Sequence, residues 1–110
     1  MEIVWSSLAK KQLKDIAQYV ADNFGSKTAQ KAIDEIQKKT NGLLAFPESG
    51  NFDKRLSTSK YVVRHVTKRP NLIYYVVDGA SIIIMAIAHE KQSPITVSKM
   101  IFRFLEHYER

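Results

Sequence analysis

The chain has 110 residues, of which 45% are hydrophobic and 25% charged, as expected of one ordinary globular domain and not of a disordered chain. Its 17 Lys and Arg against 11 Asp and Glu give a formal charge of +6, which favours an anionic partner: nucleic acid, an acidic protein or an anionic membrane surface. The absence of cysteine excludes disulfide scaffolds, zinc–thiolate sites and thiol nucleophiles. The start of the chain lacks a secretory signal pattern, and the longest apolar run, 82–88, is far shorter than the roughly 20 residues that span a bilayer. We therefore expect a cytoplasmic protein with no membrane partner.

The first half of the chain predicts a short strand followed by two helices. Residues 3–5 are β-prone, and the two serines after them are good N-cap residues. Apolar residues then recur every three or four positions over 7–24, and Gly25 is well placed to end this helix in a left-handed conformation. A second apolar stripe starts near Ser26, so the two helices should form an antiparallel hairpin. The segment from Pro47 to about residue 59 has the composition of a loop.

The second half changes to a period of two and predicts three strands, at 61–67, 72–77 and 81–89. The linkers between them are short and turn-like, which indicates an antiparallel meander. The second and third strands are apolar on both faces, so they should be central in the sheet, with helices covering one face.

Residues 95–110 predict a C-terminal amphipathic helix, which either packs back on the domain or waits for a partner. The sequence as a whole predicts an α+β fold in which a helical hairpin packs on an antiparallel sheet, in the order β-α-α-β-β-β, with this helix at the end. We expect residues 1–94 to form the main domain and residues 95–110 to extend it.

A basic run between residues 54 and 69 is the strongest local feature of the composition. Its members, with no acidic residue between them, are Lys54, Arg55, Lys60, Arg64, Lys68 and Arg69. One interpretation is a solvated edge strand whose charges discourage aggregation. The other is an anion site in which these side chains hold phosphates. Because Arg64 and His65 alternate on a strand, the run cannot converge on one patch through that strand alone.

His89 is the histidine best placed for chemistry. It ends the most apolar strand and lies close to Lys91, so it could act as a general acid or base. A lone histidine at a strand end is nevertheless more often structural. No nearby carboxylate pattern accompanies it, so the sequence predicts neither a metal site nor a cofactor.

In this order and spacing, the features resemble the RelE/ParE superfamily of toxins from bacterial type II toxin–antitoxin modules. The resemblance covers residues 3–94 and rests on Val4-Trp5-Ser6 before the first helix, the Gly25 break, Pro47 with Gly50, and the closing His89-Glu90-Lys91-Gln92. It implies the β-α-α-β-β-β fold and a growth-inhibiting toxin without a cofactor. It also implies a cognate antitoxin that wraps the toxin, with operator DNA bound only through that antitoxin.

The superfamily contains two activities. RelE-like members cleave mRNA on the ribosome, whereas ParE-like members poison DNA gyrase and have no established catalytic residues. For the first activity, the resemblance implies His89, Arg64 and Lys68 as catalytic residues of a metal-independent endoribonuclease. For either activity, it implies contacts to the target or to nucleic acid from Lys54, Arg55, Arg69 and Lys91.

Several positions depart from the RelE-like pattern. The frequent Tyr-Arg pair at the start of its second strand is Tyr61-Val62 here, and Lys91 stands where an arginine is commoner. The opening Val4-Trp5-Ser6 and the long helical hairpin look more ParE-like, so the resemblance favours gyrase inhibition, with ribosome-dependent mRNA cleavage as the alternative. A third hypothesis is a non-toxic basic module that binds another protein.

Overall fold

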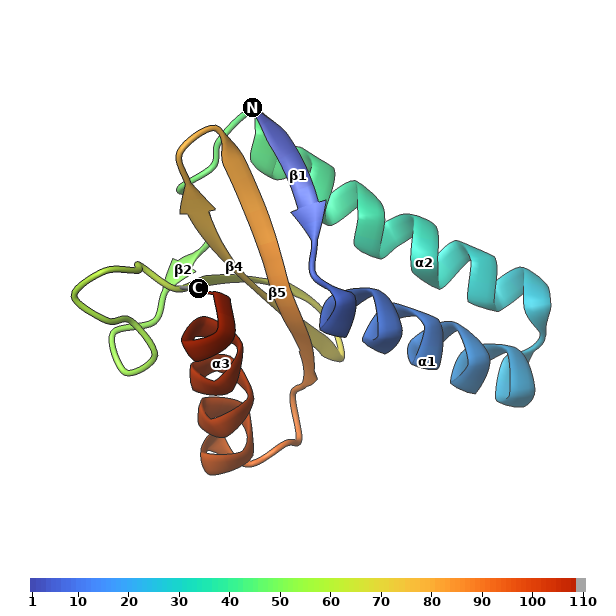
Figure 1. Ribbon diagram of the computed structural model, residues 1–110. Helices are drawn as coiled ribbons and strands as arrows, with labels where there is room; N and C mark the ends of the chain where they lie inside the picture. The colour runs from blue at the N-terminus through green and yellow to red at the C-terminus, as the bar shows by residue number, and fades with distance from the viewer. Residues whose placement is uncertain (109–110) are drawn as a thin grey trace.

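The computed structural model describes residues 1–108, and its centre is a five-stranded sheet with the strand order β1-β5-β4-β3-β2 (Figure 1). The strands are β1 (Glu2–Trp5), β2 (Asn51–Phe52), β3 (Arg64–Lys68), β4 (Asn71–Asp78) and β5 (Ser81–His89). The helices are α1 (Ser7–Phe24), α2 (Ser26–Asn41) and α3 (Pro94–Tyr108), with a 3-10 turn at Gly42–Leu44. The predicted α+β fold, its helical hairpin and its C-terminal helix are thus confirmed.

The antiparallel meander is present as β3-β4-β5, with β4 and β5 inside the sheet as predicted. Two features were not predicted. β1 pairs in parallel with β5, which makes the sheet mixed, and the short β2 lies within the segment predicted to be a loop. The meander also begins at Arg64 instead of residue 61, because Tyr61 and Val63 form hydrogen bonds with Thr58 and Ser57 of the preceding loop.

The helical hairpin begins and turns at residues whose backbone requirements are visible in the structure. The side chain of Ser6 caps α1 by accepting a hydrogen bond from the Ala9 N–H at 2.9 Å. Gly25 joins α1 to α2 with φ of 92° and ψ of 159°. The positive φ favours glycine, as predicted, but this ψ is extended and not that of a left-handed helical cap.

The sheet divides the core into two layers. On one face α1 and α2 contribute Ala9 and Ile36, which pack with strand residues such as Tyr75 and Ile84. The other face carries α3, whose buried side chains are Val97, Ile101 and Leu105. The C-terminal helix therefore packs back on the domain, and the helices cover both faces of the sheet instead of one. The last two residues of the helix predicted over 95–110 lie outside the described part of the chain.

A bulge in β5 places the start of α1 against the sheet. Tyr74 lies opposite Ala86 but Tyr75 lies opposite Ile84, so Met85 is an extra residue in the ladder. β1 ends at this point, where its last residue pairs with Ile84. Ser6 then continues the edge by donating hydrogen bonds from its N–H to Ile84 O at 3.0 Å and from its hydroxyl to Met85 O at 2.7 Å.

No helix within residues 1–108 is long and apolar enough to cross a membrane.

Candidate functional site

A large hollow lies between the helical hairpin and the far ends of the central strands, and we call it the hairpin groove. The hairpin extends past the sheet toward its Gly25 turn, so the outer halves of α1 and α2 are not covered by strands (Figure 1). The cavity there has a volume of about 670 Å³. Its apolar lining is Ile16, Tyr19, Val20, Phe24, Ala32, Ile36, Ile87 and Ala88, and its polar lining includes Gln12, Asp15, Glu35, Lys68, Arg69, Asn71, His89 and Gln92.

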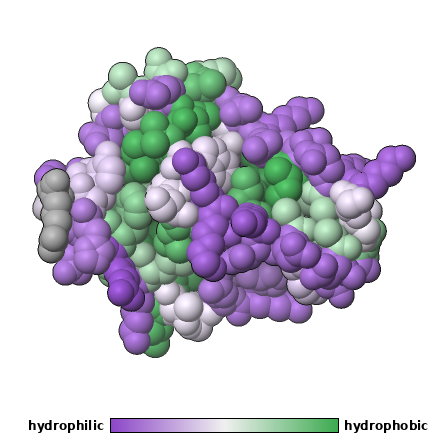
Figure 2. Space-filling model, turned by 45° about the vertical axis from the view of Figure 1, so that its right-hand side comes forward, coloured by the Kyte–Doolittle hydropathy of each residue, from purple (hydrophilic) through white to green (hydrophobic). Residues whose placement is uncertain are grey.

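Part of the apolar lining of the hairpin groove is open to solvent, whereas Ile36, Ile87 and Ala88 are buried. Tyr19 and Phe24, near the turn of the hairpin, are each 65% exposed. Figure 2, which brings the hairpin side of the molecule forward, shows hydrophobic patches separated by hydrophilic side chains. Exposed aromatic side chains beside a hollow of this size are typical of a surface that another protein covers.

Three of the predicted site residues lie together along this groove, at the ends of β3 and β5. Lys68 forms an ion pair with Glu35 of α2 at 3.0 Å, and this contact lowers the pKa of the Glu35 carboxyl. Arg69 lies 3.6 Å from the carboxylate of Glu90. His89 accepts a hydrogen bond at Nδ1 from the Lys91 N–H at 3.1 Å. The cations at the rim are thus paired with carboxylates.

Arg64 lies elsewhere and has a structural contact. It begins β3, four residues before Lys68, which separates the two positions by about 13 Å along the strand. Its guanidinium donates a hydrogen bond to Gly50 O at 3.1 Å. Gly50 in turn donates from its N–H to the Tyr75 hydroxyl at 2.9 Å, and that hydroxyl donates to Pro47 O at 2.7 Å. These bonds fix the loop before β2 against the sheet, and burial raises the pKa of Tyr75.

The remaining members of the basic run lie in the loop between β2 and β3. Lys54 and Arg55 are exposed there and do not line the hairpin groove. Lys60 lies over the ring of Tyr61, with its ammonium 5.6 Å from the ring centroid. A run that is continuous in sequence is therefore split among the loop, the start of β3 and the end of β3. The functional roles expected of Lys54, Arg55 and Lys91 remain predictions.

His65 is the more buried of the two strand histidines but has little contact with charged groups. Its ring lies 5.3 Å from that of Tyr74, on the α3 side of the sheet, and Asn51 Nδ2 is 3.5 Å from its Nε2. Burial lowers its pKa, which favours the neutral ring. Within residues 1–108 no three His, Asp or Glu side chains gather as a metal site requires.

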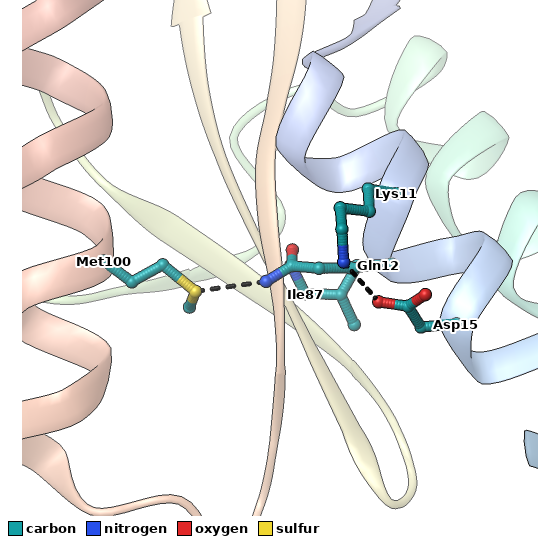
Figure 3. Close-up of polar contacts among 5 residues, drawn as sticks. All are labelled: Lys11, Gln12, Asp15, Ile87 and Met100. Atoms are coloured by element: carbon teal, nitrogen blue, oxygen red, sulfur yellow. Dashed lines mark hydrogen bonds and ion pairs between the residues drawn. The ribbon is translucent and has the colours of Figure 1, made fainter.

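The sequence interpretation missed most of the groove lining, and above all Glu35 and Gln12. The side chain of Gln12 extends from α1 past β5 toward Met100 of α3 (Figure 3). Its side-chain oxygen accepts a hydrogen bond from Ile87 N at 2.7 Å, where β5 has lost β1 as a neighbour, and its side-chain nitrogen contacts Met100 Sδ at 3.2 Å. In the sequence, the one indication of this role was that Gln12 is a polar residue next to the apolar stripe of α1.

Comparison with known proteins assigns the sequence to a family. The sequence matches the family model described as ParE toxin of type II toxin-antitoxin system, parDE, over residues 3–94. A comparison with curated proteins gives no match. Among solved structures, the fold is similar to a chain described as "Chromosomal ParDE TA system from P. aeruginosa", with a TM-score of 0.69 and 23% identity over 81% of this chain and 95% of that chain.

The chain therefore belongs to the ParE toxin family of type II toxin–antitoxin systems, as the resemblance implied. The family match ends at Pro94, the first residue of α3. The hairpin groove lies within the matched residues, whereas α3 is almost entirely an addition to them.

Proposed function

We propose that this chain is a growth-inhibiting toxin that acts on DNA gyrase without catalysing a reaction, and that a cognate antitoxin protein neutralises it. The membership in the ParE family over residues 3–94 is the observation that carries the proposal. The contacts of the basic residues support it, because Arg64 is engaged with Gly50 and Lys68 with Glu35. With these partners, neither cation is available to stabilise the charge that a general acid–base mechanism on RNA would develop.

The hairpin groove supports the antitoxin half of the proposal. An amphipathic helix binds such a groove through apolar side chains spaced three and four residues apart. The exposed Tyr19 and Phe24 offer the apolar contact, and the paired charges of Lys68 and Glu35 offer a polar rim. The formal charge of +6 favours an acidic antitoxin through faster, steered association. Operator DNA is then contacted only through the antitoxin.

The target is tested by inducible expression together with a supercoiling assay on purified gyrase. We expect growth arrest with DNA damage, inhibited supercoiling and intact transcripts. His89→Ala should inhibit gyrase as well as the wild type, because the residue is exposed and its ring accepts a local hydrogen bond, from the Lys91 N–H. Normal supercoiling at saturating protein contradicts gyrase inhibition.

Antitoxin binding is tested by co-purification with the protein encoded in the adjacent reading frame. A carboxylate in the groove lining should weaken the complex, because Lys68 and Arg69 of the lining are already paired with Glu35 and Glu90. The variant is Ala32→Glu, and the matched control is Ala45→Glu, which puts the same charge on an exposed residue outside this groove. Equal retention of the partner by both variants contradicts antitoxin binding at the hairpin groove.

Ribosome-dependent mRNA cleavage is a second candidate, because Lys68, Arg69 and His89 do lie along one groove. It predicts cleaved transcripts in a translating extract and loss of that cleavage in His89→Ala. Arg64→Ala is a poor test of this chemistry, since it also removes the hydrogen bond to Gly50. Normal growth during expression without any partner would instead favour the non-toxic protein-binding module.

A further inference from the structure

A second groove lies between the start of α1 and α3, and we call it the α3 groove. Its volume is about 510 Å³, and its lining consists of Leu8, Lys99, Met100, Arg103, Phe104 and His107. Three of these side chains are basic or imidazole, three are apolar, and none is a carboxylate. Leu8 lies within the residues that the family model matches, whereas the five lining residues from α3 lie beyond them.

The basic side chains of this groove follow one line along the helix. Lys99, Arg103 and His107 are four residues apart, so neighbouring members are separated by about 6 Å along the helix axis. Both Lys99 and Arg103 are exposed. Glu106 is the carboxylate nearby on α3, and it does not line the groove. The hairpin groove differs, since Asp15 and Glu35 are among its lining residues.

The floor of the α3 groove is held in place before any partner arrives. Met100 is fixed by the contact of its sulfur with Gln12 Nε2, and Gln12 is itself bonded to the β5 backbone (Figure 3). On its inner face α3 buries Val97, Ile101 and Leu105 in the core. A surface that is ordered in advance loses little conformational freedom on binding.

We propose that the α3 groove binds an acidic amphipathic segment of a partner polypeptide. Apolar side chains of the segment pack on Leu8 and Met100, and its carboxylates pair with Lys99 and Arg103. A helix that carries acidic residues four positions apart repeats the 6 Å spacing of the two cations, at about the same rise. The proposal concerns the α3 groove and does not depend on gyrase as the target.

A polypeptide fits this groove better than a nucleic acid does. Half of the lining is apolar, and its two fixed cations cover only about one turn of helix. A nucleic acid that binds through its phosphates uses a longer row of cations and gains little from an aliphatic floor. An acidic amphipathic segment uses both the apolar and the basic lining.

The test measures binding of two fluorescent model peptides to the full-length protein by anisotropy. One peptide is a 14-residue amphipathic helix with leucine on one face and glutamate on the other, and its counterpart has lysine in place of every glutamate. Because two exposed charge contacts are favourable with one peptide and unfavourable with the other, we expect a preference for the acidic peptide of about tenfold. In the wild-type complex, the NMR signals of Leu8 and Met100 should shift.

A matched pair of variants locates the binding. Lys99→Glu with Arg103→Glu should weaken the acidic peptide about tenfold. Lys27→Glu with Lys31→Glu reverses two exposed charges with the same spacing on α2 and should change binding less than about twofold. Circular dichroism checks that both variants are folded.

Three results would overturn the proposal. The first is equal binding of the two peptides, and the second is equal weakening by the two pairs of substitutions. The third is displacement of the acidic peptide by a single-stranded oligonucleotide that itself shifts Leu8 and Met100, which would assign the groove to nucleic acid. If a variant does not fold, the location of binding is read from the wild-type NMR signals of Leu8 and Met100, and unchanged signals contradict binding at the α3 groove.

Discussion

The hairpin groove and the α3 groove are connected through Gln12, which lines the first and contacts Met100 of the second, but they differ in chemistry. The hairpin groove is large and lined by carboxylates as well as cations, and it lies within residues 3–94. The α3 groove is smaller, has a basic rim and depends on a helix outside the family match. If both grooves bind partners as proposed, the hairpin groove offers mainly apolar area and the α3 groove adds a basic rim, so the two are suited to different segments or different partners.

The α3 groove exists only if α3 is firmly packed on the sheet. Truncation of Ile101, at the centre of α3, should therefore have the largest effect on the free energy of unfolding. Ile101 is fully buried, so Ile101→Ala should lower the free energy of unfolding by about 2–5 kcal/mol. Phe102 is next to it and 42% exposed, so Phe102→Ala should cost less than about 0.5 kcal/mol. Urea unfolding measures both values, and similar small losses would show that α3 is only loosely attached.

On the hairpin side, the corresponding weak point is the contact between Gly50 and Tyr75. A Cβ atom at Gly50 would lie 2.5 Å from the Tyr75 hydroxyl and 2.6 Å from a ring carbon. The ring is fully buried and cannot move aside easily, so Gly50→Ala should cost about 1–3 kcal/mol.

Gly42→Ala is the control for Gly50→Ala. The space around Gly42 is open and its φ of −60° is helical, so alanine should be neutral or stabilise by about 0.4–1 kcal/mol. Both free energies come from the same urea experiment. If both substitutions cost the same, the close approach of Gly50 to the Tyr75 ring has no energetic weight.

The helices and the meander could be predicted because their signals are local. The serine cap before α1, the Gly25 turn and the apolar stripes each act within a few residues, and the structure keeps all of them. The short β2 and the parallel pairing of β1 with β5 were not predictable in this way. Both depend on which strand lies next to which edge, and no period within one segment encodes that choice.

The candidate site could be predicted only in part, because its residues find their partners far along the chain. Arg64 contacts Gly50 and Lys68 contacts Glu35, so two cations of one basic run have separate partners. In the sequence these cations belong to one basic run, and the alternation of Arg64 and His65 indicated only that the run could not converge on one patch through that strand. The hairpin groove is lined by both helices of the hairpin together with the ends of the central strands, and no single apolar stripe indicates a hollow between them.

Gln12 contacts residues of both grooves, and its substitution should lower the free energy of unfolding by a moderate amount. Gln12→Leu leaves the Ile87 N–H without an acceptor, which should cost about 1 kcal/mol. Gln12→Glu keeps an oxygen acceptor at the same distance along the side chain and should recover most of that loss. Unfolding experiments give the free energies, and amide exchange at Ile87 should speed up in the first variant only. Unchanged exchange in Gln12→Leu would show that the β5 edge does not depend on this bond.

The smallest expected change in stability concerns Tyr108, at the end of α3, and is seen at alkaline pH. The Tyr108 hydroxyl donates a hydrogen bond to Asp78, and this bond to the carboxylate raises the pKa of Tyr108 to about 12. An unfolded tyrosine has a pKa of about 10, so the folded state holds the proton more tightly. The contribution to stability is therefore complete below pH ~10 and is lost as the pH rises toward 12.

Because the contact is partly exposed, it should contribute no more than about 1 kcal/mol, and a difference between variants is needed to see it. The free energy of unfolding measured from pH 9 to 12 should fall less steeply in Tyr108→Phe than in the wild type. Burial also raises the pKa of Tyr74 and Tyr75, which adds the same fall to both proteins. Asp78→Asn should have the same effect as Tyr108→Phe, since it removes the charge that holds the proton. If both variants keep the wild-type slope, the last turn of α3 is held by ring packing on Tyr61 and Phe104 and not by the hydrogen bond.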